Sequence, residues 1–482
     1  MAEQLHTWFT ALLPWLNLFI LGYYLVVNSV YFTLLFVSVG ATSRHRKGYG
    51  ADGFADLTQL PTTPPISVIV AAFNEGPNIV ESVSSLLNLN YPSHEVIVIN
   101  DGSTDDTLAN LIDSFELIEV DLIYRAHIPT QPVERFFVNP AYPGLTVVSK
   151  KNSGKADSLN VGLNLSRCPY FCSVDADSLL ERDALLRLMG PIVSSPDEII
   201  ATGGIVRIAN GCRVQEGEVA HVSMPKDFLS RLQVVEYLRC FLFGRTGWSR
   251  FGSLLVLSGT FALFEKKPVM DLGGYSIRTV AEDMELVVRL HQHMRRIRRR
   301  YRITFVSDPI CWTEAPTSLA QLARQRRRWH QGLGETLARH LTMTFNPRYG
   351  AVGMIGIPFQ WVELFGPLVE LTGYLVVATC AFLGILSTDF LVLYLVMSLL
   401  LGVLLSVGSV LLEELTERSY QSWSDLSRLL LVAVLENFGY RQLNVLWRVR
   451  GLMQFLLGGE KWDAVEKSGI GHADRTLPGA NR

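Results

Sequence analysis

The stretch that decides the fold of this chain is Ser67 to Ala72, with the sequence SVIVAA. A continuous run of β-branched and small apolar residues is typical of a strand that is buried on both faces. Pro64 and Pro65 precede this run and prevent a helix from continuing into it. Phe73 to Gly76 (FNEG) follows as a loop, and a helical pattern extends from Pro77 to Leu89. This part of the chain is therefore predicted to begin with a strand, a loop and a helix.

Three further strands repeat this arrangement. They are predicted at Glu95 to Asn100, Leu145 to Ser149 and Tyr170 to Val174, with a helix at Gly154 to Leu165. Strands that alternate with helices indicate a parallel sheet. Ligands of open α/β sheets bind outside the carboxyl ends of the strands. The polar residues expected at that edge are Asn74 and Glu75 after the first strand, Asp101 after the second, and Asp175 and Asp177 after the fourth.

Asp175-Ala176-Asp177 places two carboxylates at one strand end. Mg²⁺ and Mn²⁺ prefer hard oxygen ligands and often bridge a protein carboxylate to substrate phosphates. A DxD pattern also occurs as a turn or a helix cap, but its position after a buried strand favours the metal interpretation. The chain has no GxGxxG after its first strand and no GxxxxGK[ST], so neither a dinucleotide fingerprint nor a P-loop is present.

The composition points to membrane segments. Of 482 residues, 49% are hydrophobic and 18% are charged, whereas soluble proteins carry about a quarter charged residues. The net charge of −2 excludes a strongly basic nucleic-acid binder, and no nucleic-acid partner is expected. The six cysteines form neither a CxxC pair nor a grouping at zinc spacing, which predicts reduced thiols rather than a disulfide scaffold.

The first membrane segment is predicted near the N-terminus. No Asp, Glu, Lys or Arg occurs between Glu3 and Arg44, and the apolar run Leu12 to Ala41 fits one span, because a bilayer core needs about 20 helical residues. Residues 1–43 are therefore interpreted as an uncleaved transmembrane anchor. The basic sequence Arg44 to Lys47 (RHRK) follows. The positive-inside rule then places the next domain in the cytosol and the N-terminus outside an inner, or plasma, membrane.

Residues 351–450 are predicted to hold the C-terminal transmembrane helices, and 451–482 a tail. Leu371 to Thr388, extended backwards by Gly353 to Glu370, forms a hairpin of two spans with Phe390 to Leu412. Leu426 to Leu446 is interpreted as a third span, although it contains charged residues. A helix that lies in the membrane surface is the alternative for this third segment.

Several ionisable residues fall at or near membrane depth. Glu363 and Glu370 are seven residues apart and share one helix face, and Glu436 and Arg441 belong to the same set. Such groups are costly against lipid and usually face a bundle interior or a pore. Ion pairs that fix helix packing and the lining of a channel are both compatible with the sequence.

Four motifs, in this order, resemble those of the membrane-integrated family 2 glycosyltransferases, which include the synthases of cellulose, hyaluronan, chitin oligomers and poly-N-acetylglucosamine. They are Ile99 to Ser103 (INDGS), Asp175 to Asp177 (DAD), Ala281 to Asp283 (AED) and Gln325 to Trp329 (QRRRW). The last motif is typical of chain-extending synthases. Ala281 departs from the family, in which Thr or a similar residue often precedes the acidic pair. Only one N-terminal span is evident, and no cyclic-dinucleotide-binding domain is evident after the last span, so activation of the cellulose-synthase kind is not expected.

This resemblance implies an α/β GT-A fold with a Rossmann-like, mostly parallel sheet over residues 44–315. It also implies amphipathic interfacial helices that carry the Q-x-x-R-W element over residues 316–350. The expected activity is inverting transfer, dependent on Mg²⁺ or Mn²⁺, from a UDP-sugar donor to the end of a growing β-linked glycan. Export across the membrane is expected to accompany chain extension. Single-step transfer to a membrane lipid and a non-catalytic receptor that kept the fold are the alternatives.

The resemblance also assigns roles to individual residues. Asp283 is the expected general base, because the acceptor hydroxyl must lose its proton in the transition state; a helix N-cap is the alternative. Gln325, Arg328 and Trp329 are expected on one helix, within one turn. The residues expected to bind the donor nucleotide are Asn74, Glu75, Asp101, Lys155 and Asp175, and those expected to bind the metal are Asp175 and Asp177. The residues expected at the acceptor or diphosphate are Ser258, Gly259, Thr260, Glu282, Gln325, Arg328 and Trp329.

A basic run stands out after these motifs. Arg295 to Arg302 has the sequence RRIRRRYR and precedes a predicted strand at Ile303 to Val306. A solvated loop is the favoured interpretation. Binding of anionic lipid at the membrane surface is an alternative.

Overall fold

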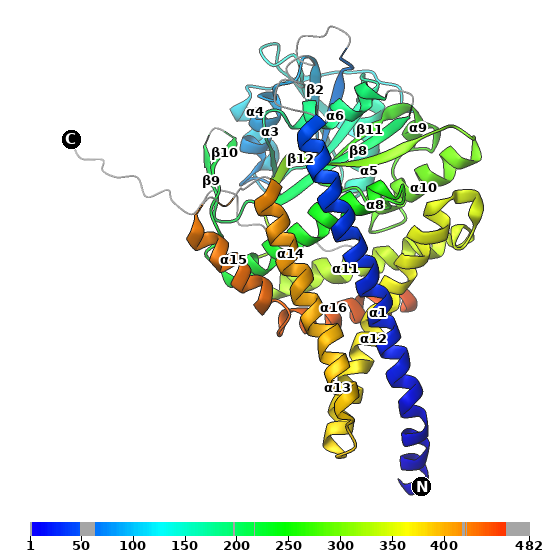
Figure 1. Cartoon of the computed structure of the whole chain (residues 1–482). Helices are drawn as coiled ribbons and strands as arrows, with labels where there is room; N and C mark the ends of the chain where they lie inside the picture. The colour runs from blue at the N-terminus through cyan, green and yellow to red at the C-terminus, as the bar shows by residue number, and fades with distance from the viewer. Residues whose placement is uncertain are drawn as a thin grey trace, which may run out of the picture.

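The computed structural model describes residues 2–48, 63–195, 198–215, 217–416, 420 and 422–458 of the chain. An α/β part is built on one large sheet, and long helices project from it (Figure 1). The predicted combination of an α/β domain with membrane-spanning helices is confirmed.

The sheet contains ten strands within the described residues. From one edge to the other they are β3 (Ile118–Val120), β4 (Val133–Val138), β5 (Leu145–Lys150), β2 (His94–Asp101), β1 (Ile66–Ala72), β6 (Tyr170–Asp175), β11 (Phe261–Glu265), β8 (Ile199–Ile208), β12 (Arg302–Thr313) and β7 (Ser178–Leu180). Strands β5, β2, β1 and β6 are mutually parallel, so their carboxyl ends lie at one edge. Strand β11 runs antiparallel between β6 and β8, and β8 is parallel to β12. The four predicted strands and their parallel arrangement are confirmed.

Helix α5 (Lys155–Leu165) packs on β1 and β2 at very short range. A Cβ atom built on Gly162 would lie only 2.2 Å from Cγ2 of Ile69, so a larger residue would push the helix away from the sheet. The beginning of α5 is thereby held near the carboxyl edge of β2. The other helices of the α/β part are α3 (Ile79–Leu87), α4 (Thr107–Ser114), α6 (Ala184–Ser194), α9 (Lys266–Asp271) and α10 (Glu282–Arg296). A small hairpin is formed by β9 (Arg213–Gln215) and β10 (Glu218–His221).

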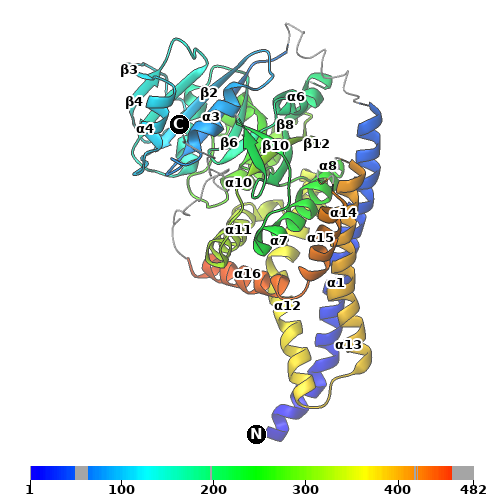
Figure 2. The ribbon, with the colours of Figure 1, turned by 90° about the vertical axis from the view of Figure 1, so that its left-hand side faces the viewer.

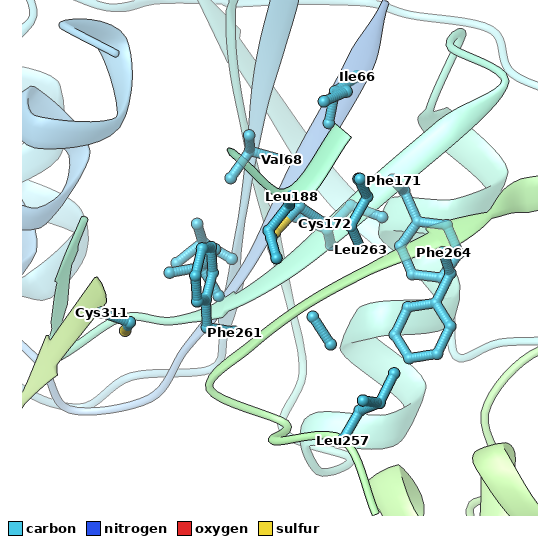
Figure 3. Close-up of a cluster of buried hydrophobic side chains, with 14 of the residues drawn as sticks. Ile66, Val68, Phe171, Cys172, Leu188, Leu257, Phe261, Leu263, Phe264 and Cys311 are labelled. Carbon is cyan, nitrogen blue, oxygen red and sulfur yellow. The ribbon is translucent and has the colours of Figure 1, made fainter. Parts of the chain in front are cut away.

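The core of the α/β part is built from the central strands. Figure 3 shows part of it, with Ile66 and Val68 from β1 and Phe171 and Cys172 from β6. The rings of Phe171 and Phe264 stack with their centroids 5.3 Å apart. These side chains are fully or almost fully buried, so the strands that carry the polar ends form a rigid platform.

Three helices of the described chain are long and apolar enough to cross a membrane: Ala11–Ala41, Val352–Phe382 and Thr388–Thr416. The first lies inside α1 (Ala2–Gly48), where the N-terminal span is predicted. The other two form the predicted hairpin beside α1, as both views show (Figures 1 and 2). The elements of the hairpin are the π-helix η4 (Val352–Gly356), α12 (Ile357–Phe382), α13 (Thr388–Leu395), the π-helix η5 (Val396–Leu400) and α14 (Leu401–Thr416).

The predicted third C-terminal span at Leu426 to Leu446 is wrong. This stretch is divided between α15 (Trp423–Leu435) and α16 (Tyr440–Leu457). The break falls at Gly439, whose φ of +87° ends a right-handed helix. Helix α16 packs against α11 (Leu319–Arg339) and lies across the base of the α/β part in Figure 2. Residues 426–446 therefore do not form the one long apolar helix that a span needs, and a position in the membrane surface stays a prediction.

A layer of short helices connects the sheet with the spans. It comprises α7 (Phe228–Tyr237), the π-helix η1 (Leu238–Arg245), α8 (Thr246–Arg250) and α11. Helices η1 and α8 both contact α1, and α8 also contacts β12. After α11 the chain forms two 3₁₀ turns, η2 (Leu341–Met343) and η3 (Pro347–Tyr349), rather than a second long amphipathic helix.

Candidate active site

One cavity of about 840 Å³ extends from the carboxyl edge of the sheet to the membrane-spanning helices. Its walls come from the loops after β1, β2 and β6, from the start of α10, from α11, and from α1, α12, α14 and α16. The predicted site residues that line it are Glu75, Asp101, Lys155, Asp175, Asp177, Ser258, Gly259, Thr260, Glu282, Asp283, Gln325, Arg328 and Trp329. Segments far apart in the sequence therefore meet at one site, as the four ordered motifs require.

Asn74 is the exception among the predicted donor-binding residues, since it is not part of the cavity wall. Its side-chain Oδ1 accepts a hydrogen bond of 2.8 Å from the backbone N–H of Thr104. Its own N–H donates to Oγ of Ser103 at 3.0 Å, and its backbone has a left-handed φ of +55°. Asn74 thus ties the loop after β1 to the loop after β2, and its contact with the nucleotide stays a prediction.

The carboxylate of Asp101 is fixed by hydrogen bonds from neighbouring residues of the protein. Its Oδ1 accepts hydrogen bonds from Nζ of Lys150 at 2.7 Å and from the N–H of Ser153 at 3.0 Å, and its Oδ2 accepts one from Gly154 at 2.8 Å. Lys150 is completely buried and also pairs with Asp157 at 3.1 Å. The carboxylate therefore shapes the loop before α5 while it lines the cavity. Lys150 and Asp157 were not expected, because no sequence pattern indicates that the end of a strand pairs with the following helix.

Lys155 joins two of the four motifs and the loop at Ser258 to Thr260. Its ammonium pairs with Oδ1 of Asp175, donates to the carbonyl of Gly259 at 3.3 Å, and lies 3.9 Å from Glu282. Thr260 donates to Oδ2 of Asp175 at 2.9 Å. Burial disfavours the Lys155 ammonium, but Asp175 and Glu282 outweigh this effect and raise its pKa. A permanent positive charge therefore stands between the carboxylates.

Asp175 and Asp177 suit a divalent cation only together with ligands from outside the protein. Both carboxylates reach the cavity, and Asp177 is largely buried beneath it. No group of three or more His, Cys, Asp or Glu side chains is arranged to hold a metal within the described residues. Mg²⁺ usually binds to one or two carboxylates and completes its shell with water and substrate phosphates. The donor set fits that kind of site.

Asp283 lies in the first turn of α10, opposite Lys155. Its Oδ2 accepts a hydrogen bond from the N–H of Gly259 at 3.1 Å, and its Oδ1 accepts one from Met284 at 2.7 Å. Ala281 occupies the N-cap position, so the alternative role of Asp283 as the cap is wrong. Burial raises the pKa of neighbouring Glu282; Lys155 opposes this rise and Asp283 adds to it.

Helix α11 carries Gln325, Arg328 and Trp329 into the cavity, as predicted. Between them, Arg326 is buried and donates to Glu236 of α7 at 2.8 Å, with its guanidinium 4.3 Å from the centroid of the Trp329 ring. Tyr440 of α16 donates to the same Glu236 carboxylate at 2.7 Å. These contacts set the position of α11 against two other helices. Arg326 is within the quoted motif, but Glu236 and Tyr440 have no recognisable signal in the sequence.

Arg245 is a further wall residue that the sequence analysis missed. It ends the π-helix η1, and its guanidinium lies 3.8 Å from the centroid of the Phe241 ring. Burial lowers its pKa, an effect that the charge of Asp283 opposes. Arg245 reaches the cavity wall from the end of a π-helix. No sequence pattern predicts a π-helix, so this residue was not expected.

The membrane end of the cavity is lined by ion pairs. Glu363 accepts a hydrogen bond of 2.7 Å from Tyr31 and pairs with Arg448 at 3.3 Å. Glu370 lies 3.7 Å from Arg441. All five side chains line the cavity. The ion-pair interpretation of Glu363 and Glu370 is therefore confirmed, and the lining of a channel stays a prediction. Glu436 pairs instead with Arg239 of η1 and accepts a hydrogen bond from Ser406.

Comparison with known proteins gives one family match. The family described as "Glycosyltransferase like family 2" matches residues 64–332. Poly-beta-1,6-N-acetyl-D-glucosamine synthase of Staphylococcus aureus (strain COL) is 28% identical over 283 residues, which are 59% of this chain and 58% of that enzyme. The enzyme of the same name from Staphylococcus epidermidis is 26% identical over 288 residues, with the same coverage. The chain thus matches little more than half the length of these relatives.

Solved structures were also compared. A mannosyltransferase of Pyrobaculum calidifontis in complex with GDP-Man and Mn²⁺ gives a TM-score of 0.49 at 19% identity, covering 88% of this chain and 99% of that one. Residues 1–349 of S. aureus TarS give a TM-score of 0.34 at 17% identity, covering 78% and 91%.

Proposed function

This chain belongs to the glycosyltransferase like family 2, and we propose that it extends a β-linked polysaccharide in the membrane. The donor is a UDP-sugar, the acceptor is the free end of the growing glycan, and the configuration at the anomeric carbon is inverted. The product leaves along the cavity between the spans. The poly-N-acetylglucosamine synthases among its relatives make UDP-N-acetylglucosamine the first donor to test.

The continuity of the cavity carries this proposal. The same 840 Å³ space is lined by the strand-end carboxylates, by the Gln325–Trp329 element and by polar side chains of the spans. A single-step transferase that acts on a lipid needs no polar path along its spans. A growing glycan does, because sugar hydroxyls require hydrogen-bonding partners at membrane depth. Tyr23, Tyr31 and Gln360 are side chains of this kind on the cavity wall.

The residues of the cavity divide the chemistry between them. The carboxylate of Asp283 accepts the proton of the acceptor hydroxyl, because an alcohol is a poor nucleophile until that proton is removed. The N–H of Gly259 holds this carboxylate in place. On the leaving side, Lys155 and Arg328 lie where negative charge develops on the diphosphate. Trp329 offers a ring face to a sugar, since 44% of its surface is exposed although it lines the cavity.

A divalent cation, Mg²⁺ or Mn²⁺, completes this proposal. Bound to Asp175, Asp177 and the donor diphosphate, it would act as a Lewis acid for the leaving group. Both Asp175 and Asp177 are assigned to this binding, and Asp175 also accepts hydrogen bonds from Lys155 and Thr260. Asp175 then orients Lys155 toward the diphosphate.

UDP release by the purified, detergent-solubilised full chain tests the proposal. Candidate donors are UDP-N-acetylglucosamine, UDP-glucose, UDP-galactose and UDP-glucuronate, each with Mg²⁺, with Mn²⁺ and with EDTA. One donor is expected to turn over, only with metal, and to yield a polymer that a glycosidase of matching specificity degrades. A product that remains a monoglycosylated lipid would overturn polymer formation. Failure of all four donors, in the presence of native membrane lipids, would count against catalysis.

Reconstituted vesicles test export separately. With the catalytic domain facing outward and donor added outside, polymer is expected inside the vesicles, protected from added glycosidase. Polymer that stays entirely on the donor side would contradict export while leaving catalysis intact.

A further inference from the structure

The basic run Arg295 to Arg302 is not used by the proposed chemistry. It covers the end of α10 and the beginning of β12. Within the described residues, Arg299 is the one member of this run that pairs with a carboxylate, through two hydrogen bonds of 3.1 and 2.8 Å to Glu265. The Arg295 guanidinium also lies 5.7 Å from the centroid of the Tyr301 ring. The side chains of the remaining arginines are exposed at positions 295, 296, 298, 300 and 302. Within the described chain no carboxylate forms an ion pair with any of these five.

The fold brings this run to the end of a membrane span. A Cβ built on Gly350 would lie 2.7 Å from Nη2 of Arg295, so the two residues are in contact. Gly350 stands two residues before the candidate span Val352–Phe382. Arg348, also exposed, stands four residues before it. The arginines therefore lie at the depth where the chain enters the bilayer, where lipid head groups are found.

The surroundings of these arginines lack negative charge. No Asp or Glu occurs from 286 to 307 or from 336 to 362, the two stretches that meet at Arg295 and Gly350. The same two stretches contain nine arginines. Two of the nine, Arg289 and Arg299, pair with Glu285 and Glu265, and the excess of positive charge that remains favours an anionic partner.

Apolar side chains project from the turns beside these arginines. Phe345 and Leu341 are 68% and 58% exposed, and Met354 and Ile355 at the start of the span are also exposed. Phe345 occupies a left-handed backbone conformation with φ +53°, which costs conformational energy in a residue other than glycine. In water these side chains would be an unfavourable patch, whereas at a bilayer surface they can enter the acyl chains.

We propose that Arg295, Arg296 and Arg348 form a binding site for anionic phospholipid head groups, and that Leu341, Phe345, Met354 and Ile355 insert beside it. The partner is a membrane leaflet that contains acidic phospholipid. Its phosphates are bound by guanidinium groups, which match phosphate geometry with paired N–H donors. The site lies on the outer surface of the α10 and η3 region, apart from the cavity, and does not depend on the identity of the sugar donor.

Lipid enrichment tests this proposal without reference to activity. The full chain is reconstituted into vesicles of phosphatidylcholine with 30 mol % phosphatidylglycerol and re-extracted in mild detergent, and the retained lipid is quantified by mass spectrometry. The native chain is expected to be enriched in phosphatidylglycerol. Each arginine removed in the double variant Arg295→Gln/Arg348→Gln should lower the enrichment about fivefold. In a separate sample, 0.5 M NaCl should weaken the enrichment of the native chain.

Two matched variants keep the test specific. Arg295→Lys/Arg348→Lys retains both charges and should keep most of the enrichment. Arg125→Gln/Arg167→Gln removes the same charge from exposed positions outside the patch and should leave the enrichment unchanged. A native chain without enrichment would overturn the proposal, as would a double patch variant that elutes as a monodisperse particle and retains phosphatidylglycerol fully. Equal losses in the patch and Arg125/Arg167 variants would reduce the effect to net charge and would also overturn it.

Discussion

The two ends of the cavity hold their charges in different ways. At the sheet end, Asp101, Lys150 and Asp157 form a network within 57 consecutive residues, reinforced by backbone N–H groups. At the membrane end, each buried acid pairs with an arginine far away in the chain. The partners there are Glu363 with Arg448, Glu370 with Arg441, and Glu436 with Arg239. A comparable pair outside the cavity wall joins Glu413 of α14 to Arg207 of β8.

The difference is physical. A parallel sheet has a loop at each strand end, and these loops supply N–H groups that share the charge of a carboxylate. Regular helices at membrane depth have no spare backbone N–H groups, so a buried carboxylate needs a cation from another helix. Charges at the sheet end are therefore supported by several partners, and those at the membrane end by few. The following experiments test this contrast, from the largest expected effect to the smallest.

Asp283 lies between the two ends and should matter for turnover rather than folding. Asp283→Asn retains the hydrogen-bonding shape but removes the base, and should lower kcat about 10²- to 10⁴-fold. The unfolding temperature should stay close to that of the native chain, measured by differential scanning fluorimetry beside donor-dependent UDP release. Asp113→Asn, an exposed carboxylate on α4, serves as the control. Native turnover in Asp283→Asn would remove the assigned base.

The pair of Arg207 on β8 and Glu413 on α14 lies outside the cavity wall and tests the cost of a buried carboxylate that pairs with one cation. Both side chains are buried, and they are joined by contacts of 2.8 and 2.9 Å. Arg207→Met leaves the Glu413 charge buried without its cation and should cost about 3 to 5 kcal/mol of stability. The double variant Arg207→Met/Glu413→Leu should recover most of this loss in denaturant unfolding. A double variant as unstable as the single one would show that the pair does more than neutralise buried charge.

Asp101→Asn should be milder, although it also breaks a buried pair. Lys150 keeps Asp157 at 3.1 Å, and the amide oxygen of Asn can still accept from one backbone N–H. We expect a loss of about 1 to 3 kcal/mol in the free energy of unfolding. A loss larger than that of Arg207→Met would contradict the contrast between a shared and a single-partner charge.

His291 gives the smallest expected effect, as a pH dependence. It is buried on α10, with its ring nitrogens 2.8 Å from the carbonyl of Leu254 and 2.8 Å from the hydroxyl of Tyr301. Burial lowers its pKa from 6.5 to about 4. As the pH falls below 6.5 the unfolded chain takes up the proton first, so stability is lost between about pH 6.5 and pH 4.

The slope from this one group is at most about 1.4 kcal/mol per pH unit. Denaturant unfolding at pH 7, 6 and 5 measures it, and His291→Gln should flatten the dependence. His127→Gln, at an exposed position, should leave the slope unchanged. An unaltered slope in His291→Gln would assign the acid sensitivity to other groups.

Several residues of the candidate site could be predicted from the sequence, because the sequence pattern shows where buried strands end. A buried β-branched run followed by a polar residue places that residue at the carboxyl edge of a parallel sheet, and Asp101, Asp175 and Asp177 are found there. Asn74 also follows a strand, but its hydrogen bonds join the loop after β1 to the loop after β2. The difference depends on a left-handed φ that the residue type permits but does not require.

The membrane region was less predictable. Leu426 to Leu446 has the length and apolar content of a span, but Gly439 breaks it and Glu436 turns toward Arg239 of η1. One membrane span and two shorter helices can have the same amino-acid composition. Which of the two forms depends on the residues with which the charged side chains pair in the folded chain. Likewise, the contact of Arg295 with Gly350 joins two stretches that are 55 residues apart.

The sequence by itself determined the α/β class, the order of the central strands' polar ends, the apolar segments and the motifs of the family. These features are local, because hydrophobic periodicity and strand-end chemistry act within a few residues. Only the tertiary structure decided that the site opens into a cavity along the spans, that Arg326, Glu236 and Tyr440 position α11, and that the basic run contacts Gly350, just before a candidate span. Those outcomes depend on contacts between distant segments, whose free energy is set by packing and burial rather than by the order of residues along the chain.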